Sequence, residues 1–457
     1  MVISALIILF LCLQNNPSYG KINIYDPNLT VELITKGLKS ATSMSFLGKD
    51  DLLVLEQQGV VKRVVGNKTL DIPPLNITKI VKSTYERGLL GIAIPNGEAE
   101  NQDKSHGFES KIYLYYTEKI TNQNMDHKCA NVCDKNERIV NSLYEYELRD
   151  GRLVKPKLLI HLPLEDGDIG LEHVGGKIVL GPDKRIYIST GDSYPCRSME
   201  DCRQAATSGK LYAKTANSEN GTDPVGIGGI IALPLSEDSD RQYDYPFGKA
   251  SPLSLYYAYG IRNSFGLDFD PITGILWDTE NGPFFGDEIN LVEPGFNSGW
   301  ARVQGIWPIT NYDFLIKDAP RPNYFPNNST KTFVNGLYDF EGKGKYSSPE
   351  VTWKDSIGIT GIKFFNSDKL GDEYKNDMFV GSFAKGLLYH FELSPDRKNI
   401  SFSPELPHNV IEEAKLKDSL VIKGLRGITD LQVSPDGYLY ILTYDGNIWK
   451  ITKSSTK

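Results

Sequence analysis

Short runs in which apolar and polar residues alternate recur along the whole chain, and turn residues bound each run. The clearest copies are 181–192, which opens Gly-Pro-Asp, and 434–451, which opens Ser-Pro-Asp-Gly. Weaker copies occupy 50–65, 111–116, 274–277 and 377–381. Val, Ile and Tyr favour half-buried strands, and Pro, Asp and Gly favour the turns between them. The pattern therefore predicts many short strands, and no long stretch has a helical period.

Six copies of one strand-and-turn unit indicate blades that stack around a common axis. We expect an all-β fold, a six-bladed β-propeller with four-stranded blades around a channel, that spans residues 21–457 as a single domain. A pair of β-sandwiches is the alternative. Three polar stretches, about 117–140, 193–225 and 302–350, are expected to be inserted loops at one end.

The N-terminus carries an apolar run from Val2 to Leu13. A run of this length is too short to span a bilayer but is typical of a signal peptide. We expect residues 1–20 to act as a signal peptide or as an N-terminal membrane tether, and the protein to be extracytoplasmic (secreted, periplasmic or at the cell surface). A buried strand is the alternative, and no Lys or Arg precedes the run.

Cysteine usage agrees with export. Cys12 lies inside the apolar run, which leaves two close pairs in polar stretches. We expect two local disulfides, Cys129–Cys133 and Cys196–Cys202; these spacings are unusual for zinc, the alternative. Asn-x-Ser/Thr sequons, which permit glycosylation of an exported chain, occur at Asn28, Asn67, Asn76, Asn220, Asn327, Asn328 and Asn399.

The charge balance excludes one class of partner. Lys and Arg number 50 and Asp and Glu number 58, so the formal net charge is −8. A protein that binds nucleic acid by neutralising phosphates is usually basic. We therefore expect no nucleic-acid partner.

Among the six histidines, His173 is the candidate for chemistry. It lies in Gly-Leu-Glu-His-Val-Gly-Gly-Lys directly before a predicted strand, and an imidazole held there can act as a general base. Asp192, at the far end of the same hairpin, is placed to orient the ring. A turn histidine with a purely structural role is the alternative, and we expect that role for the other histidines.

Two further segments carry candidate ligands. Arg262 and Asn263 lie between glycines, where the backbone can approach a bound molecule. The segment 280–290 combines carboxylates with the carbonyls around a Gly-Pro pair, and such hard oxygens suit Ca²⁺. An ordinary acidic turn is the alternative.

These motifs occur in an order that resembles the soluble quinoprotein glucose/sorbosone dehydrogenase family, which includes the aldose sugar dehydrogenases. The similarity runs from about residue 31 to 452 and rests on the His173 segment, the Arg262-Asn263 segment and these further motifs: 86–91 (Glu-Arg-Gly-Leu-Leu-Gly), 181–183, 286–291 (Gly-Asp-Glu-Ile-Asn-Leu), 297–300 (Asn-Ser-Gly-Trp), 377–381 and the terminal Ser-Pro-Asp-Gly unit.

The resemblance implies pyrroloquinoline quinone (PQQ) held over Ca²⁺ at the channel mouth, and oxidation of the anomeric C1 hydroxyl of an aldose to a lactone. It places His173 as the catalytic base and Asp192 as its partner. Arg262 and Asn263 fall on quinone-contacting positions. The partners implied are a sugar substrate and an external electron acceptor whose identity the sequence does not give.

The resemblance also implies the calcium ligands. Gly282 and Pro283 match positions whose carbonyls bind the cofactor calcium in the glucose dehydrogenase branch. Glu288 and the backbone of Ser298 match a calcium site of the aldose branch.

The sequence departs from the family pattern at three places. Ala384 stands where a quinone-binding Lys is usual, with Lys385 one step along; Gly427-Ile428-Thr429 replaces an Arg-x-Arg, with Arg426 one residue early; and Glu86 replaces a Gln of the aldose branch. These losses favour the alternative function, a cofactor-free propeller that acts as an extracytoplasmic binding protein. A Ca²⁺-dependent lactonase is a third hypothesis. Lys385 and Arg426 facing the His173 end would favour the enzyme.

Overall fold

The computed structural model describes residues 21–95, 110–121, 137–164, 172–194, 213–308, 336–402, 406, 409–412 and 418–454. Strands dominate these segments, whereas the α-helix α4 (Glu237–Arg241) has five residues. Three short 3₁₀ turns accompany it: η4 (Lys214–Ala216), η5 (Leu253–Leu255) and η7 (Asp372–Tyr374). The predicted all-β fold class is confirmed.

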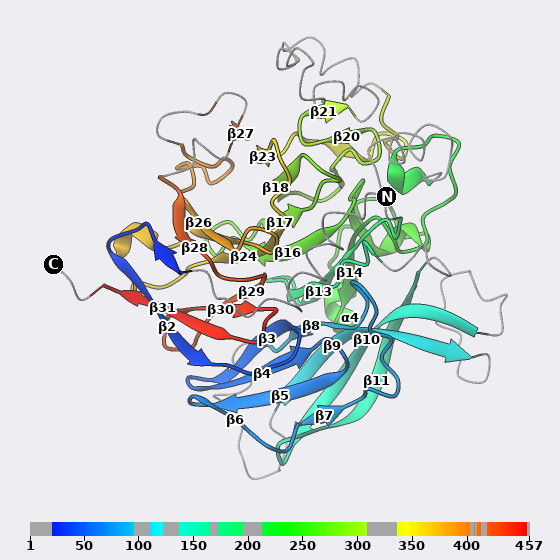
Figure 1. The fold of residues 1–457 in the computed structure, drawn as a ribbon. Helices are drawn as coiled ribbons and strands as arrows, with labels where there is room; N and C mark the ends of the chain where they lie inside the picture. Colours follow the sequence, from blue (N-terminus) through cyan, green and yellow to red (C-terminus); the bar gives the residue numbers. More distant parts are fainter. Residues whose placement is uncertain are drawn as a thin grey trace, which may run out of the picture.

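Three of the large sheets begin between residues 41 and 178 of the chain (Figure 1). The first contains β3 (Ala41–Gly48), β4 (Asp51–Glu56), β5 (Val60–Val65), β6 (Lys68–Thr69) and β7 (Leu75–Asn76). The second contains β8 (Leu89–Ala93), β9 (Ser110–Thr121), β10 (Glu137–Arg149) and β11 (Arg152–Pro163). The third contains β12 (Ile178–Leu180), β13 (Arg185–Thr190), β14 (Gly229–Pro234), β15 (Tyr256–Tyr259), β19 (Phe296–Asn297) and β22 (Lys345–Tyr346).

Three more large sheets and one small one complete the described part of the chain. The fourth contains β16 (Ser264–Phe269), β17 (Leu276–Glu280), β18 (Asp287–Val292), β23 (Val351–Trp353) and β27 (Val410–Ile411). The fifth contains β24 (Ile359–Phe364), β25 (Met378–Ser382), β26 (Leu387–Phe391), β28 (Leu420–Lys423) and β1 (Asn23–Ile24). The sixth contains β29 (Ile428–Val433), β30 (Leu439–Thr443), β31 (Ile448–Lys453) and β2 (Leu29–Thr35). A two-stranded sheet pairs β20 (Val303–Gln304) with β21 (Trp307–Pro308).

The sheets follow one another around a ring. One edge strand of each large sheet contacts the edge strand of the next in a cyclic order: β3, β8, β12, β16, β24, β29 and again β3. Apolar side chains fill the space between each pair of consecutive sheets, as where Leu267 and Leu276 of the fourth sheet pack with Ile230 of the third. This is a propeller arrangement, because each sheet buries its two faces against its two neighbours.

The ring is closed by the N-terminal segment. Strand β2 pairs antiparallel with β31, from Leu29 opposite Lys453 to Thr35 opposite Ile448. Figure 1 shows this blue strand beside the red C-terminal strands. The sixth sheet therefore contains strands from both ends of the chain. This pairing closes the ring between the sixth sheet and the first.

Two details of the expected architecture need correction. Two of the six large sheets have four strands and the others have five or six, because short strands from the connections add to the outer edges. The stretch expected as a loop at 117–140 begins and ends as strand, since β9 reaches Thr121 and β10 starts at Glu137. The cross-strand pairing of these two strands compensates for their polar sequence, because it satisfies the backbone.

Several sequence predictions fall outside the described residues. These are the segment 1–20 and the two expected disulfides, Cys129–Cys133 and Cys196–Cys202. Within the part of the chain that is described, no helix has the length and apolar character needed to cross a membrane.

Candidate functional site

His173 and Asp192 lie in contact at one end of the ring. His173 precedes β12 and Asp192 follows β13, and the Nδ1 atom of the ring is 2.7 Å from Asp192 Oδ1. Both side chains are buried. Because a carboxylate only accepts hydrogen bonds, Nδ1 carries the proton and Nε2 is left as a proton acceptor. The Trp300 indole N–H donates to the other oxygen, Asp192 Oδ2, at 2.6 Å and fixes the carboxylate.

The backbone around His173 needs special support. His173 has a φ of 52°, in the left-handed region that side chains other than glycine rarely adopt. Its amide donates to Glu86 Oε2 at 2.7 Å, which holds this conformation. Gly175 follows with a φ of 64°, and a Cβ there would lie 2.3 Å from the Ser189 carbonyl oxygen. At the glycine-flanked histidine, the chain therefore passes closely over β13.

Arg262 and Asn263 connect this histidine to the next sheet. The Arg262 guanidinium is buried and donates from Nη1 to the Asn281 carbonyl at 2.8 Å, but its Nε has no hydrogen-bond partner among the described residues. Burial lowers the pKa of Arg262, while the charges of Asp192, Glu86 and other carboxylates oppose that shift. The Asn263 amide donates to the same Glu86 oxygen at 3.1 Å. An anionic or carbonyl oxygen of a ligand would satisfy the free guanidinium N–H.

A group of buried carboxylates lies on β17 and β18. The register of these strands places Glu280 opposite Glu288 and Asp278 opposite Asn290. The Ser298 hydroxyl is 2.6 Å from Glu280 Oε2 and 3.1 Å from Glu288 Oε2, so both carboxylates converge on one group. Three acceptor oxygens nearby have no donor within the described chain: Asp278 Oδ2, Asn290 Oδ1 and Gln304 Oε1.

The surplus of acceptors has an electrostatic consequence. Burial raises the pKa of Asp278 and of Glu280, and the charge of Asp278 raises the pKa of Glu280 further. Burial and the charge of Glu280 likewise raise the pKa of Glu288 well above its usual range. Without a cation, these carboxyl groups therefore retain protons at pH values where exposed carboxyl groups have lost them.

This shift predicts how the metal-free protein responds to pH. Because folding raises the pKa of Glu280 above its ordinary 4.5, the folded state holds protons that the unfolded chain has released. Its stability should therefore fall as pH rises from about 4.5 through the neutral range. Thermal unfolding in EDTA across this range measures the slope, and added Ca²⁺ should remove it by replacing the protons. Glu280→Gln keeps an acceptor for Ser298 and should flatten the slope; an unchanged slope in that variant would contradict the assignment.

Asp287 organises the loop that contains Gly282 and Pro283. Its fully buried carboxylate accepts the Gly282 amide at 3.0 Å and the Ser356 hydroxyl at 2.7 Å through Oδ1. Its Oδ2 accepts backbone amides of the segment 357–359. One carboxylate therefore ties the Gly-Pro loop to a neighbouring blade, which fixes where the loop carbonyls lie.

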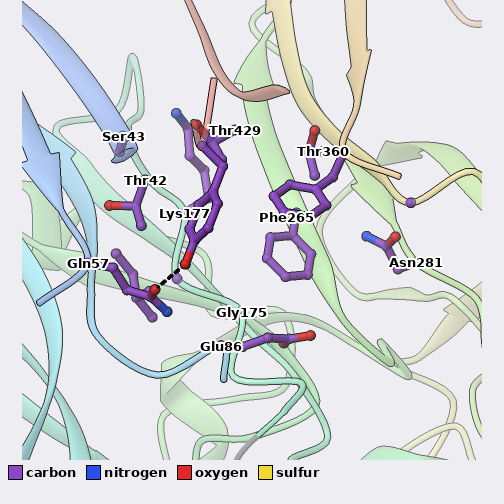
Figure 2. Close-up of a pocket in the computed structure, with 15 residues that line it drawn as sticks. Thr42, Ser43, Gln57, Glu86, Gly175, Lys177, Phe265, Asn281, Thr360 and Thr429 are labelled. Atoms are coloured by element: carbon purple, nitrogen blue, oxygen red, sulfur yellow. Dashed lines mark hydrogen bonds between the residues drawn. The ribbon is translucent and has the colours of Figure 1, made fainter. Parts of the chain in front are cut away.

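A cavity of about 90 Å³ lies beside these groups on the ring axis. Residues from the inner strands of all six large sheets or their entries contribute to its wall, including Thr42, Leu90, Gly176, Phe265, Thr360 and Thr429. Figure 2 shows Glu86, Gly175 and Asn281 at one side and Lys177 and Thr429 at the other. The Asn281 carbonyl binds Arg262 and Glu86 binds the His173 amide, so the cavity adjoins both candidate groups.

The cations that flank the two family departures do not reach this cavity. Lys385 is exposed, and Arg426 is half-buried near Asp445, where its charge partly offsets the raised pKa of that carboxyl. Neither belongs to the cavity wall, in contrast to the arrangement that would favour the enzyme. Lys177 does line the cavity, but its Nζ is 2.6 Å from Asp430 Oδ1.

The residues present fit calcium and one end of the quinone. Within the described segments, no group of three or more His, Cys, Asp or Glu side chains is arranged to hold a metal ion. Glu280 and Glu288 nevertheless converge with undonated oxygens nearby, which is a donor set that a hard cation satisfies. The orphaned Arg262 Nε fits a quinone carbonyl. For the carboxylates of PQQ, the cavity wall formed by the described residues would offer Lys177 as its one charged donor, and Lys177 is already paired with Asp430.

Sequence reasoning missed several groups of the site. Trp300 belongs to a quoted motif, Asn-Ser-Gly-Trp, but its hydrogen bond to Asp192 depends on the approach of segments 108 residues apart. Asp278 and Asn290 lie on facing positions of β17 and β18, and their alternation with Glu280 and Glu288 was the available signal. Lys177 and Asp430 had no signal, since 253 residues separate them.

Comparisons with known proteins identify the family and the fold. A family model described as Glucose / Sorbosone dehydrogenase matches residues 38–450. Aldose sugar dehydrogenase YliI of Escherichia coli is 29% identical over 273 residues, 58% of this chain and 61% of that protein, so the alignment spans less than two thirds of the relative. Quinoprotein glucose dehydrogenase B of Acinetobacter calcoaceticus is 25% identical over 411 residues, 81% of this chain and 76% of that protein. The PQQ-bound aldose sugar dehydrogenase of Streptomyces coelicolor superposes with a TM-score of 0.54 at 18% identity, over 94% of this chain and 99% of that chain, a likeness of fold.

Proposed function

This chain belongs to the glucose/sorbosone dehydrogenase family, and from that premise we propose that it is an exported quinoprotein that oxidises the C1 hydroxyl of an aldose to a lactone. The observation that carries the proposal is the buried His173–Asp192 pair beside an arginine whose Nε lacks a partner in the described chain. A base with its proton acceptor free and a buried cation nearby are the groups that alcohol oxidation requires.

Each residue of the proposed active site has a separate role in the oxidation. Asp192 accepts the Nδ1 proton of His173 and keeps Nε2 free to receive the hydroxyl proton of the sugar. Trp300 holds Asp192, and Glu86 holds the His173 amide, so the base is fixed before substrate arrives. Arg262 is placed to stabilise negative charge that develops on a ligand oxygen.

PQQ would contact Arg262 and Asn263, and Ca²⁺ would bind the carbonyls of Gly282 and Pro283. When bound, PQQ supplies the hydride acceptor and Ca²⁺ polarises its carbonyl. A second calcium would be held by Glu288 with the backbone of Ser298, and we add Glu280 to this set because it shares the Ser298 hydroxyl with Glu288.

We also propose that each of the six large sheets forms one blade. The cyclic contacts of their edge strands support this count. The signal-like pattern of residues 1–20 supports export, with a sugar substrate and a separate electron acceptor outside the cytoplasm.

Titration of the EDTA-treated protein with PQQ and Ca²⁺ tests the cofactor assignment. A ligand that binds the native state at a hundredfold excess over its Kd stabilises it by about 2.7 kcal/mol, which raises the melting temperature by several degrees. Arg262→Leu should lose the shift caused by PQQ, and Glu288→Gln should weaken the shift caused by Ca²⁺. No shift of the unsubstituted protein at high quinone concentration would contradict the proposal.

A second candidate function is a cofactor-free propeller that binds a ligand or partner outside the cytoplasm. The observation that favours it is the exposure of Lys385 and the placement of Arg426 outside the cavity wall. Lys385 and Arg426 are then unavailable to bind the quinone in place of the cations that the family usually has. In the titration, this function predicts that PQQ leaves the melting temperature unchanged.

A further inference from the structure

Glu86 is a charged side chain of the cavity wall that has one carboxylate oxygen without a donor among the described residues. Its Oε2 accepts both the His173 amide and the Asn263 side chain, at 2.7 and 3.1 Å. The hydrogen bonds of the described residues leave its Oε1 without a donor, and the half-buried side chain lines the cavity. One carboxylate oxygen therefore fixes the protein, and the other is available to a ligand.

The charges around the cavity make this oxygen selective. The other ionised residue in the wall, Lys177, is neutralised by Asp430 at 2.6 Å. Arg262 interacts with Glu86 through its charge, but its Nη1 donates a hydrogen bond to the Asn281 carbonyl. Glu86 thus presents its carboxylate to a ligand in the cavity, close to the backbone of His173, the proposed base.

We infer that the site favours aldoses that carry an ammonium group next to the oxidised carbon, the 2-amino-2-deoxy-aldoses, over neutral and acidic sugars. The inference rests on the proposed function, because it takes His173 as the group that meets the C1 hydroxyl. In this proposal the substituent of the carbon next to C1 lies against Glu86, because the Oε2 atom of Glu86 binds the His173 amide at 2.7 Å. An ammonium donates a charge-assisted hydrogen bond there, a hydroxyl donates a weaker neutral one, and a carboxylate is repelled.

Glu86→Gln separates selectivity from positioning. The glutamine oxygen can still accept the His173 amide and the Asn263 amide, while its NH₂ group replaces the free Oε1 in the cavity. The variant should therefore keep the wild-type melting temperature and lose the fixed charge. Glu293→Gln, a substitution of the same type at an exposed position outside the cavity wall, is the matched control.

Ligand-observed NMR on the cofactor-free protein, at mildly acidic pH where the sugar amine is protonated, measures the ranking directly. Glucosamine should bind at least about fivefold more tightly than glucose or N-acetylglucosamine, in which the amine is neutralised, and glucuronate, whose carboxylate is on C6 and not on the carbon next to C1, should show no such advantage. Glu86→Gln should abolish the preference and Glu293→Gln should retain it. Equal affinities, absence of binding by all four sugars, or a preference that persists in Glu86→Gln would overturn the inference.

The ratios of kcat/KM in the enzyme loaded with PQQ and Ca²⁺ distinguish this inference from the proposed function. Turnover of all aldoses with equal kcat/KM would overturn the selectivity and leave the dehydrogenase standing. Selective binding of glucosamine without turnover of any aldose would overturn the dehydrogenase and leave the selectivity standing.

Discussion

His173→Ala is expected to lower kcat by about 10²–10⁴-fold, the usual contribution of a positioned general base. The loss follows from the removal of Nε2, the ring nitrogen that can accept the hydroxyl proton while Nδ1 is hydrogen-bonded to Asp192 at 2.7 Å. The fold should be retained, because Asp192 keeps the Tyr194 amide and the Trp300 indole as donors. Dye reduction by protein loaded with PQQ and Ca²⁺ measures kcat, and a thermal melt measures folding.

The chain provides its own control for this experiment. His390 on β26 forms another histidine–aspartate pair, with Nε2 at 3.0 Å from Asp377 Oδ2, and it does not line the cavity. His390→Ala should therefore leave kcat unchanged. Full activity of His173→Ala, or an equal loss in His390→Ala, would show that His173 is not the base.

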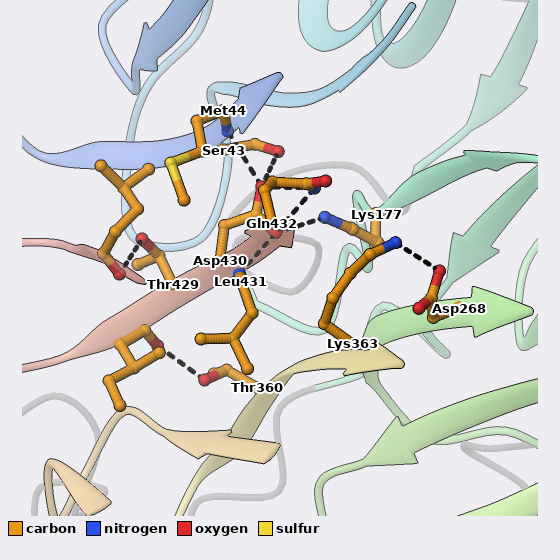
Figure 3. A network of polar contacts seen from close by, with 12 residues as sticks. Ser43, Met44, Lys177, Asp268, Thr360, Lys363, Thr429, Asp430, Leu431 and Gln432 are labelled. Atoms are coloured by element: carbon orange, nitrogen blue, oxygen red, sulfur yellow. Dashed lines mark hydrogen bonds and ion pairs between the residues drawn. The ribbon is translucent and has the colours of Figure 1, made fainter. Parts of the chain in front are cut away.

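Lys177→Met is expected to reduce the free energy of unfolding by about 3 kcal/mol, at the lower end of the cost of breaking a buried ion pair. Lys177 lies directly before β12 and Asp430 lies on β29, strands that are opposite each other in the cyclic order of the ring. Figure 3 shows the lysine reaching Asp430, which also binds Ser43 and the Met44 amide. Without the lysine, the Asp430 carboxylate, which is 1% exposed, is left buried without a cationic partner. Its remaining hydrogen-bond donors moderate the cost.

Chemical denaturation of three variants tests this account. Lys111→Met is the matched control, since Lys111 pairs with Glu145 at 3.3 Å but is 42% exposed, and its loss should cost less than about 1 kcal/mol. The double variant Lys177→Met with Asp430→Asn should be more stable than Lys177→Met alone, because no charge is left uncompensated. If Lys177→Met costs no more than Lys111→Met, the ion pair does not stabilise the ring.

The strand pattern and the family motifs could be read without coordinates because both are local. Gly-Pro-Asp turns and alternating apolar residues predict strands from interactions within a few residues. The segment around His173 shows the same principle, since its glycines accommodate a tight crossing of β13. The expected loop at 117–140 was wrong at its ends, because the pairing of β9 with β10 stabilises residues whose sequence is largely polar.

The site depends on relations that no local pattern carries. The convergence of Glu280 and Glu288 on Ser298 requires the register of β17 with β18 and the position of a third segment. The bond between Trp300 and Asp192 joins residues that are 108 positions apart in the sequence. Whether the cations next to Ala384 and Gly427 line the cavity depends on the path of the backbone at those positions. In this structure, Lys385 is exposed to solvent.

By itself, the sequence determined that this protein is an all-β propeller of the glucose/sorbosone dehydrogenase family, and it identified His173, Asp192, Arg262 and Asn263 as candidates. The fold class follows from the spacing and type of the residues, whereas the family follows from the resemblance of its motifs. Only the tertiary structure decided that Lys177 is engaged by Asp430, that no described residue donates to Glu86 Oε1, and that Lys385 and Arg426 lie outside the cavity wall. The physical reason is that ring closure sets these distances, and it brings together side chains up to several hundred residues apart.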